Sequence, residues 1–343
     1  MPLLTLFALK ALLELEALNS NNVRGGTCLA EAGGAKKSGW RLSLQCQPAF
    51  RTGHSLSSRI SHLASRIEHP VSCIAPPSHP TIECAARQEY SDAMSAPYRL
   101  ITIPPSHYCE KARWALEKAE ISYREEGHPP LFHRLPVKLA KGEHSTPVLV
   151  AGEMVLPDST DILQFIDVEH AEGWHPYPTD SQLRVEAEEL EEVFDTRLGP
   201  HTRRIAYYHL LQHKELFLAS VLAGVGGLER TLFRVGSPLI KKLMRVGMRI
   251  DDEGAERSLG YVRSVFATVG ELLDDGRPYL VGKKFGAADL TFAALAAPVL
   301  LPRNYGSPLP SLDEVPTELL AQIEEFRSLP AGEFALRIYR DHR

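Results

Sequence analysis

The stretch from Tyr98 to Val168 constrains the fold most, because strand and helix patterns follow one another there in a fixed order. Residues 98–103 alternate and are rich in β-forming side chains, two prolines end that strand, and residues 109–119 follow helical spacing. A strand near 121–124, a helix near 131–140, strands at 148–151 and 154–156, and a helix over 158–168 complete the unit. This βαβ-ββα order predicts a small mixed sheet covered by helices.

The parts on either side of this unit have different patterns. Residues 171–180 contain Gly173, Pro176 and Pro178 and are typical of a linker, and the residues after them are mainly helical in period. We therefore expect an extension over 1–93, an α/β domain over 96–170, the linker over 171–180 and an all-α helical bundle over 181–343. The first bundle helix is expected from Leu183 to Leu198, with Gly199-Pro200 interrupting it before residues 201–211.

Charge and apolar patterning exclude several classes of function. The net charge of −5 divides unevenly: residues 1–95 hold nine Lys/Arg against seven Asp/Glu, which leaves 29 against 36 for residues 96–343. A mildly acidic globular part argues against nucleic-acid binding. No apolar run reaches the roughly 18 residues that a transmembrane helix needs. Cys109 is the only cysteine after residue 84, so a disulfide framework is excluded there and a reducing compartment is expected.

The extension over residues 1–93 has a different composition. Between Glu31 and Glu68 it contains six Lys/Arg and seven serines without an acidic residue, which is typical of an organellar transit peptide. The extreme N-terminus lacks early basic residues, however, and Met94 stands just before the first strand. Two interpretations stay open: a cytoplasmic protein that starts at Met94, with an unstructured or mis-assigned upstream extension, or a plastid or mitochondrial protein.

The start of the helix near residue 107 is the first candidate for chemistry. A side chain just before a helix faces unpaired amides and the positive end of the helix dipole, and both favour a thiolate. The Ser106 hydroxyl could donate to the sulfur of a bound thiol, or Cys109 could itself be the thiol, with a pKa lowered by the same field. The structural alternative is that Ser106 only caps the helix and Cys109 is a small buried residue.

Two further segments could complete a site for a small thiol compound. Pro147 at the head of a strand can take the cis form, which can leave the backbone of Thr146 open to an extended ligand. Asp158 and Ser159 precede a helix and could hold the ammonium and carboxylate of an amino-acid head group. A trans proline and an ordinary helix cap are the structural alternatives.

These residues resemble the glutathione S-transferases. Residues 98–168 are similar to the family's thioredoxin-like N-terminal domain, with Ser106-His107-Tyr108-Cys109 at its active-site turn, Thr146-Pro147-Val148 at its Val-Pro turn and Asp158-Ser159 at its Glu-Ser pair. Residues 280–290 are similar to a helix-start motif in the family's helical C-terminal domain, with Gly286 in place of the usual Ser/Thr cap. Serine at position 106 is typical of the serine-type transferases, whereas thiol transferases carry cysteine there.

The resemblance implies a fold and a mechanism. It implies a thioredoxin-like domain followed by an all-helical domain, and a detoxifying transferase that needs glutathione as co-substrate and no metal. Ser106 would stabilise the glutathione thiolate for attack on a small electrophile. The tripeptide would be bound by Thr146, Pro147, Val148, Asp158 and Ser159, with His133, or instead Lys138 or Lys141, at its glycyl carboxylate. Two alternatives remain: a thiol reductase using Cys109, and a binding protein that does not catalyse.

The expected helical domain is less informative about substrate and partners. By analogy with the family, Arg203 and Tyr207 would face the active site and line the electrophile pocket. The long basic segment over residues 216–248 could contact a membrane surface, but its charge pattern favours a solvated helix pair. Family members usually form homodimers, so a homodimer is expected by analogy, although the chain shows no clear dimer signature.

Overall fold

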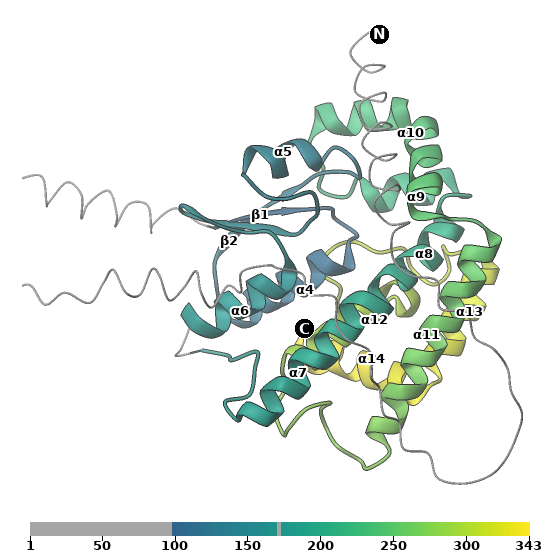
Figure 1. Cartoon of the computed structure of the whole chain (residues 1–343). Helices are drawn as coiled ribbons and strands as arrows, with labels where there is room; N and C mark the ends of the chain where they lie inside the picture. Colours follow the sequence, from purple (N-terminus) through teal and green to yellow (C-terminus); the bar gives the residue numbers. More distant parts are fainter. Residues whose placement is uncertain (1–97, 170–172) are drawn as a thin grey trace, which may run out of the picture. The chain divides into compact units, whose positions relative to one another are not determined.

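The computed structural model describes residues 98–169 and 173–343, which belong to one compact unit (Figure 1). The extension predicted over residues 1–93 lies outside the described residues. Four strands form a mixed sheet in the order β2-β1-β3-β4. Strand β1 (Tyr98–Thr102) pairs parallel with β2 (Tyr123–Gly127) and antiparallel with β3 (Val148–Ala151), which pairs antiparallel with β4 (Met154–Leu156).

The alternation of the strands decides which residues enter the core on each face of the sheet. Ile101 on β1 and Val148 on β3 pack with Val137 from helix α5 (Arg134–Leu139). Successive strand residues point to opposite faces, so the fully buried Leu100 and Leu149 face the other side. Helices α4 (His107–Lys118) and α6 (Ser159–Glu169) lie next to each other below the sheet in Figure 1, while α5 lies above it.

The rest of the described chain is helical, as the sequence predicted. This thioredoxin-like sheet followed by helices confirms the predicted fold class. The helical elements are α7 (Ser181–Val193), the π-helical segment η2 (Phe194–Leu198), α8 (Gly199–Leu210), α9 (Lys214–Val221), α10 (Gly227–Met248), α11 (Asp252–Leu273), α12 (Ala287–Leu300), α13 (Thr317–Arg327) and α14 (Pro330–His342). No helix within the described ranges is both long and apolar enough to span a membrane.

The predicted break at Gly199-Pro200 is wrong. Helices α7 and α8 are joined without a gap through the π-helical segment η2, and Pro200 lies in the first turn of α8. Proline is accommodated there because the first amides of a helix have no intrahelical acceptor to lose. The wider π-helical turn before it is the irregular part of this joint.

Helix α12 is the apolar centre of the helical region, since nearly all of its residues are buried. It packs against α4, α7, α8 and α14. Its start is held by Asp289, whose carboxylate accepts hydrogen bonds from the backbone N–H groups of Leu280 at 2.7 Å and Gly286 at 2.9 Å. Glycine has no side chain to return a bond, so this is half of the predicted capping box. Burial raises the pKa of Asp289 to about 7, against the lowering effect of these backbone bonds.

We expect Asp289→Ala to destabilise the protein strongly. The substitution leaves two N–H groups, those of Leu280 and Gly286, without their acceptor in a buried position. An unsatisfied buried group costs about 1–3 kcal/mol, so the free energy of unfolding should fall by about 2–4 kcal/mol. Urea denaturation followed by circular dichroism measures this change. Asp313→Ala, at an exposed loop position, is the matched control and should change stability by less than about 0.5 kcal/mol.

Candidate active site at the start of helix α4

Ser106 caps helix α4 at the edge of the sheet. Its backbone is extended, and its Oγ accepts a long hydrogen bond of 3.5 Å from the N–H of Cys109. The Ser106 carbonyl accepts the N–H of Glu110 at 2.9 Å, which begins the helix. Because the cap uses only a lone pair of the hydroxyl, its proton can be donated either to the sulfur of Cys109 behind it or to a ligand. Ser106 is half-buried, so this proton can reach a ligand.

Cys109 lies directly behind this cap and is fully buried. Burial raises the pKa of its thiol, while the charge of Arg113 and hydrogen bonds from Ser106, Thr146 and the backbone of Ile103 oppose that rise. Its sulfur therefore lies between the serine loop and the turn that contains Pro147. The two segments that the sequence placed in one site meet around this thiol.

The turn before β3 has the backbone form that the sequence argument considered for it. The peptide bond between Thr146 and Pro147 is cis. Thr146 is half-buried, whereas Pro147 and Val148 are buried, and Val148 opens strand β3. The side chain of Thr146 points to the active-site turn through its contact with Cys109.

Asp158 and Ser159 stand at the start of α6, as expected. The exposed Asp158 accepts a hydrogen bond from the N–H of Thr160 at 2.9 Å through Oδ1 and so caps the helix. Ser159 is 1% exposed, and its Oγ has no hydrogen-bond partner among the described residues. A buried hydroxyl without a partner costs free energy and is well suited to a ligand that would satisfy it.

Tyr108 comes from the same turn as Ser106, but its hydroxyl is already engaged. It donates to the backbone carbonyl of Asp195 at 2.7 Å, and burial raises its pKa well above the usual range. Gly199 lies against the Tyr108 ring so closely that a Cβ at Gly199 would collide with the tyrosine hydroxyl. Of the polar side chains at positions 106, 108 and 109, Ser106 alone combines a hydroxyl proton that no backbone carbonyl holds with access to a ligand.

A buried ionic cluster lies beneath α4 and α6. The ammonium of Lys111 contacts Glu191 and Asp195, each at 2.8 Å, and Thr160 at 3.0 Å. Burial disfavours the charged lysine, yet the charges of Glu191 and Asp195 outweigh it and raise the lysine pKa. Glu191 also accepts the hydroxyl of Tyr177 at 2.6 Å.

One carboxylate oxygen of Asp195 has no partner in the described part of the chain. Oδ2 of Asp195 is paired, but its buried Oδ1 has no partner among the described residues. Burial raises the pKa of Asp195, Lys111 lowers it, and the charges of Glu191 and Asp158 raise it further. Two carboxylates, those of Glu191 and Asp195, thus share the charge of one lysine, and the charge of Asp158 also acts on Asp195, so the field around Asp158 and Asp195 favours an additional cation.

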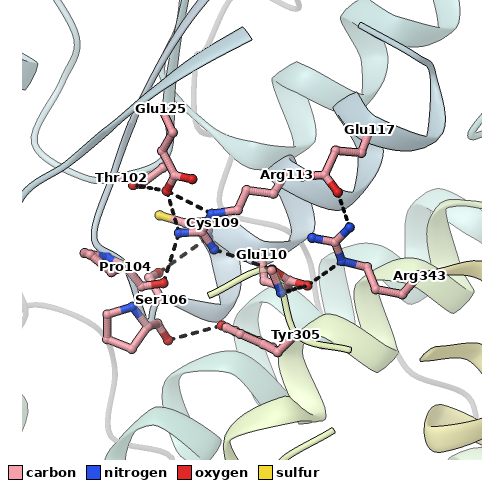
Figure 2. Close-up of polar contacts among 12 residues, drawn as sticks. Thr102, Pro104, Ser106, Cys109, Glu110, Arg113, Glu117, Glu125, Tyr305 and Arg343 are labelled. Carbon is pink, nitrogen blue, oxygen red and sulfur yellow. Dashed lines mark hydrogen bonds and ion pairs between the residues drawn. The ribbon is translucent and has the colours of Figure 1, made fainter. Parts of the chain in front are cut away.

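A second network holds α4 from its other side, as Figure 2 shows. The buried Arg113 guanidinium donates to Glu125 at 2.9 Å and to the carbonyl of Pro104 at 2.9 Å, next to Cys109. The fully buried Glu110 accepts from Arg343 at 2.8 Å and from the backbone of Gly306 at 3.0 Å. These contacts fix the helix start relative to residues near the C-terminus of the chain.

Two histidines near the site are neutral at physiological pH. His107 is buried and its Nε2 lies 2.8 Å from the carbonyl of Gly199, which makes this nitrogen the donor; burial, followed by the charge of Arg203, lowers its pKa to about 3. His133 lies just before α5, and burial, followed by the charges of Arg134 and His128, lowers its pKa to about 4. His133 can therefore offer a neutral hydrogen bond to a carboxylate but no ionic one, whereas Lys138 and Lys141 are exposed.

The two side chains predicted to line a substrate pocket do approach the turn. Arg203 on α8 is close enough to Tyr108 and His107 for its charge to lower both of their pKa values. Tyr207, one turn later, lies near Cys109. Burial raises the pKa of Tyr207 to about 12; the charge of Arg203 opposes this rise and that of Cys109 adds to it. Both side chains are half-buried. Tyr207 packs on the cluster formed by α9 and α10.

Sequence reasoning missed several residues of this region. Tyr305, whose hydroxyl donates to the carbonyl of Pro105 at 3.1 Å, comes from the loop after α12. Asp195, Glu191 and Lys111 were also missed, because their partners are far apart in the sequence. An acidic pair four residues apart, at 191 and 195, was the only available signal, and it is common on exposed helices. No group of three or more His, Cys, Asp or Glu side chains in the described ranges is arranged to hold a metal ion.

Comparisons with known proteins agree with this architecture. Residues 100–174 match the family model for the glutathione S-transferase N-terminal domain. A glutathione S-transferase of Ceriporiopsis subvermispora, solved in complex with glutathione, aligns with 72% of this chain and 98% of its own at 14% identity and a TM-score of 0.50. A β-etherase of Sphingobium aligns with 71% of this chain and 99% of its own, at 17% identity and a TM-score of 0.47. No curated protein sequence matches the chain.

Proposed function

Since residues 100–174 belong to the N-terminal domain family of the glutathione S-transferases, we propose that this protein binds glutathione and transfers its thiolate to a small electrophile. The tripeptide lies along the edge of the sheet, with its cysteinyl backbone on Thr146 and its sulfur at Ser106. The Ser106 hydroxyl donates to the sulfur while the start of α4 stabilises its negative charge. The thiol proton passes to solvent water, and the thiolate then forms a sulfur–carbon bond while the leaving group departs, which is chloride in the case of a chlorodinitrobenzene.

The observation that carries this proposal is the meeting of Ser106 and Thr146 around Cys109. A thiol bound above that point has a free hydroxyl on one side and the turn at Pro147 on the other. Arg203 lies near Tyr108, and Tyr207 lies near Cys109, so both side chains are close to the turn that an electrophile must approach. We assign them to the electrophile pocket on that ground.

The head group of glutathione fits the start of α6. The γ-glutamyl carboxylate meets the unpartnered Ser159 hydroxyl and the helix-terminal amides, and its ammonium meets Asp158 and Asp195. At the other end of the tripeptide, His133 donates a neutral hydrogen bond to the glycyl carboxylate. Lys138 and Lys141 remain the cationic alternatives for that contact.

A thiol reductase that uses Cys109 as nucleophile receives less support from the site. A reactive cysteine needs an accessible sulfur and a lowered pKa. Cys109 is fully buried, and burial raises its pKa. A binding protein without catalysis remains the second candidate, because the free Ser159 hydroxyl favours binding whether or not turnover follows.

Binding and turnover measured on the full chain test the proposal. We expect isothermal titration calorimetry to give a glutathione Kd in the micromolar to low millimolar range, together with conjugation of a chlorodinitrobenzene electrophile. Binding without turnover would support the non-catalytic candidate. Absence of both would overturn the proposed function.

Asp195→Asn should weaken glutathione binding about tenfold, because it removes one negative charge from the ammonium site. Glu191→Gln is the matched control, since it takes a carboxylate from the same lysine and should change the Kd by less than about twofold. The defect of Asp195→Asn should disappear for a glutathione analogue that lacks the γ-glutamyl amino group. An equal loss for both ligands would show that Asp195 acts only on the structure of the site.

A further inference from the structure

Helix α10 carries an apolar stripe that faces away from the rest of the described chain. Leu228, Val235, Leu239 and Val246 are spaced by seven, four and seven residues and are 75%, 73%, 43% and 67% exposed. At 3.6 residues per turn this spacing keeps all four on one side of the helix. Monomeric proteins seldom expose such a continuous apolar surface without a use for it.

The buried side of α10 is distinct from this stripe. Phe233, Ile240 and Met244 have the same seven- and four-residue spacing and pack against α9. Each of them lies five positions after a residue of the exposed stripe, namely Leu228, Val235 and Leu239. Five positions correspond to a rotation of roughly 140° around the helix. The exposed stripe is therefore not the edge of the internal core but a second apolar surface on the same helix.

Positive charge lies along one flank of the stripe. Arg234, Lys242 and Arg245 are exposed, and none of them forms an ion pair within the described part of the chain. The whole helix carries five Lys/Arg against one acidic residue, Glu229, which is paired with His128 at 2.9 Å. This contrasts with residues 96–343 as a whole, where acidic residues outnumber Lys/Arg by 36 to 29.

A neighbouring element adds to this surface. Helix α5 lies beside the first half of α10, because Phe132, just before α5, contacts Phe233 with ring centroids 6.0 Å apart (Figure 1). Leu135 and Leu139 of α5 are 52% and 76% exposed, and Lys138 and Lys141 are exposed as well. Two adjacent helices thus expose leucines together with lysines.

We propose that α10 binds the surface of an anionic membrane, with its apolar stripe in the headgroup region and its cations on acidic lipid headgroups. An amphipathic helix with exposed Leu and Val beside Lys and Arg has the composition of interfacial segments. Each Lys or Arg near such a surface strengthens binding. The stripe on α10 contains none of the residues assigned to glutathione and does not depend on the proposed reaction.

A second copy of the chain is a poorer fit to the same stripe. In an antiparallel symmetric pair of α10 helices, each flank of the stripe faces the same flank of the other copy. The flank that carries Arg234, Lys242 and Arg245 would then lie against the same cationic flank of the other copy, and like charges at close range repel. An anionic surface instead gives every one of these cations a partner of opposite charge.

Vesicle sedimentation of the full 343-residue chain tests the proposal. Vesicles of phosphatidylcholine with about 30% phosphatidylserine should bind the protein, phosphatidylcholine alone should bind it at least about tenfold more weakly, and salt should weaken binding. Lys242→Glu/Arg245→Glu should lower the partition coefficient at least about 30-fold. The matched control Lys283→Glu/Lys284→Glu, which makes the same charge change at exposed positions before α12, should bind like wild type.

The apolar contribution is tested separately. Val235→Ser/Leu239→Ser should lower the partition coefficient at least about tenfold, whereas Val185→Ser/Val193→Ser, at exposed positions of α7, should leave it unchanged. Equal binding by wild type and both α10 variants would overturn the proposal. A second result would also overturn it: vesicles bind no protein, and sedimentation velocity shows a concentration-dependent dimer that the Val235→Ser/Leu239→Ser variant no longer forms.

Discussion

Replacing Ser106 with alanine is expected to lower kcat/KM for conjugation of glutathione to a chlorodinitrobenzene electrophile about 100-fold, as loss of one preorganised donor does in other sites. The variant keeps the fold, because a missing cap bond costs only about 1 kcal/mol. It removes the hydroxyl that we propose donates to the glutathione sulfur, together with the acceptor of the Cys109 N–H. The pKa of bound glutathione, measured from thiolate absorbance against pH, should rise in the variant.

Cys109→Ala is the matched comparison at the same turn. Cys109 is buried and its thiol is not accessible to a substrate, so its loss should leave kcat/KM within about threefold of wild type. A slightly lower thermal stability is the expected effect of the small cavity. The opposite pattern, with activity lost in Cys109→Ala and kept in Ser106→Ala, would transfer the reaction to the buried thiol and support a reductase.

Lys111→Met is expected to be the most destabilising change on α4. Among the residues that the structure describes, this lysine is the only cation that pairs with both Glu191 and Asp195, and its side chain is fully buried. Removing one partner from a buried ionic cluster costs about 3–5 kcal/mol, because the remaining charges stay buried without compensation. Urea denaturation at pH 7 measures the change in the free energy of unfolding.

This loss should depend on pH with a defined sign. Without the lysine, the charge of Lys111 no longer opposes burial, which already raises the pKa of Asp195, so the folded variant binds more protons than the unfolded chain at pH values above about 4. The stability of the variant therefore falls as pH rises above about 4, and the difference from wild type shrinks as pH falls towards 4. A loss that is constant across this range would show a packing effect of the substitution instead.

A second substitution provides the control. Glu191→Gln in the Lys111→Met background removes one of the uncompensated charges, so the double variant should recover part of the lost stability at pH 7. If the double variant instead loses as much stability as Lys111→Met and Glu191→Gln together, the charge explanation is contradicted.

Local pattern alone predicted the sheet unit well. Strands at residues 148–151 and 154–156 were predicted with the bounds that the structure shows, because Pro147 and Gly152 end the neighbouring segments and β-forming residues alternate between them. The helix over 131–140 is shorter in the structure, over 134–139. The short strand after α4 was placed near 121–124 and is found at 123–127, because its glutamates are partnered by arginines rather than by an apolar face. The break at Gly199-Pro200 was mispredicted because the sequence does not show that Pro200 lies in the first turn of a helix, where proline is tolerated.

The residues of the candidate site also differ in whether local sequence could predict them. Residues next to a helix start or a strand start, such as Ser106, Thr146 and Ser159, could be found because local chemistry marks them. Residues that act across the fold, such as Asp195 and Tyr305, could not be found, because their neighbours at the site are 37 and 200 positions away.

The sequence by itself determined the order of strands and helices, the helix-start position of Ser106 and the proline at the head of β3, since each follows from backbone chemistry within a few residues. Only the tertiary structure decided that Cys109 is sealed beneath Ser106 and Thr146, that Tyr108 gives its hydroxyl to Asp195, and that α10 exposes an apolar stripe. Burial and pairing depend on which distant elements meet, and they set the pKa values and free groups on which the chemistry rests.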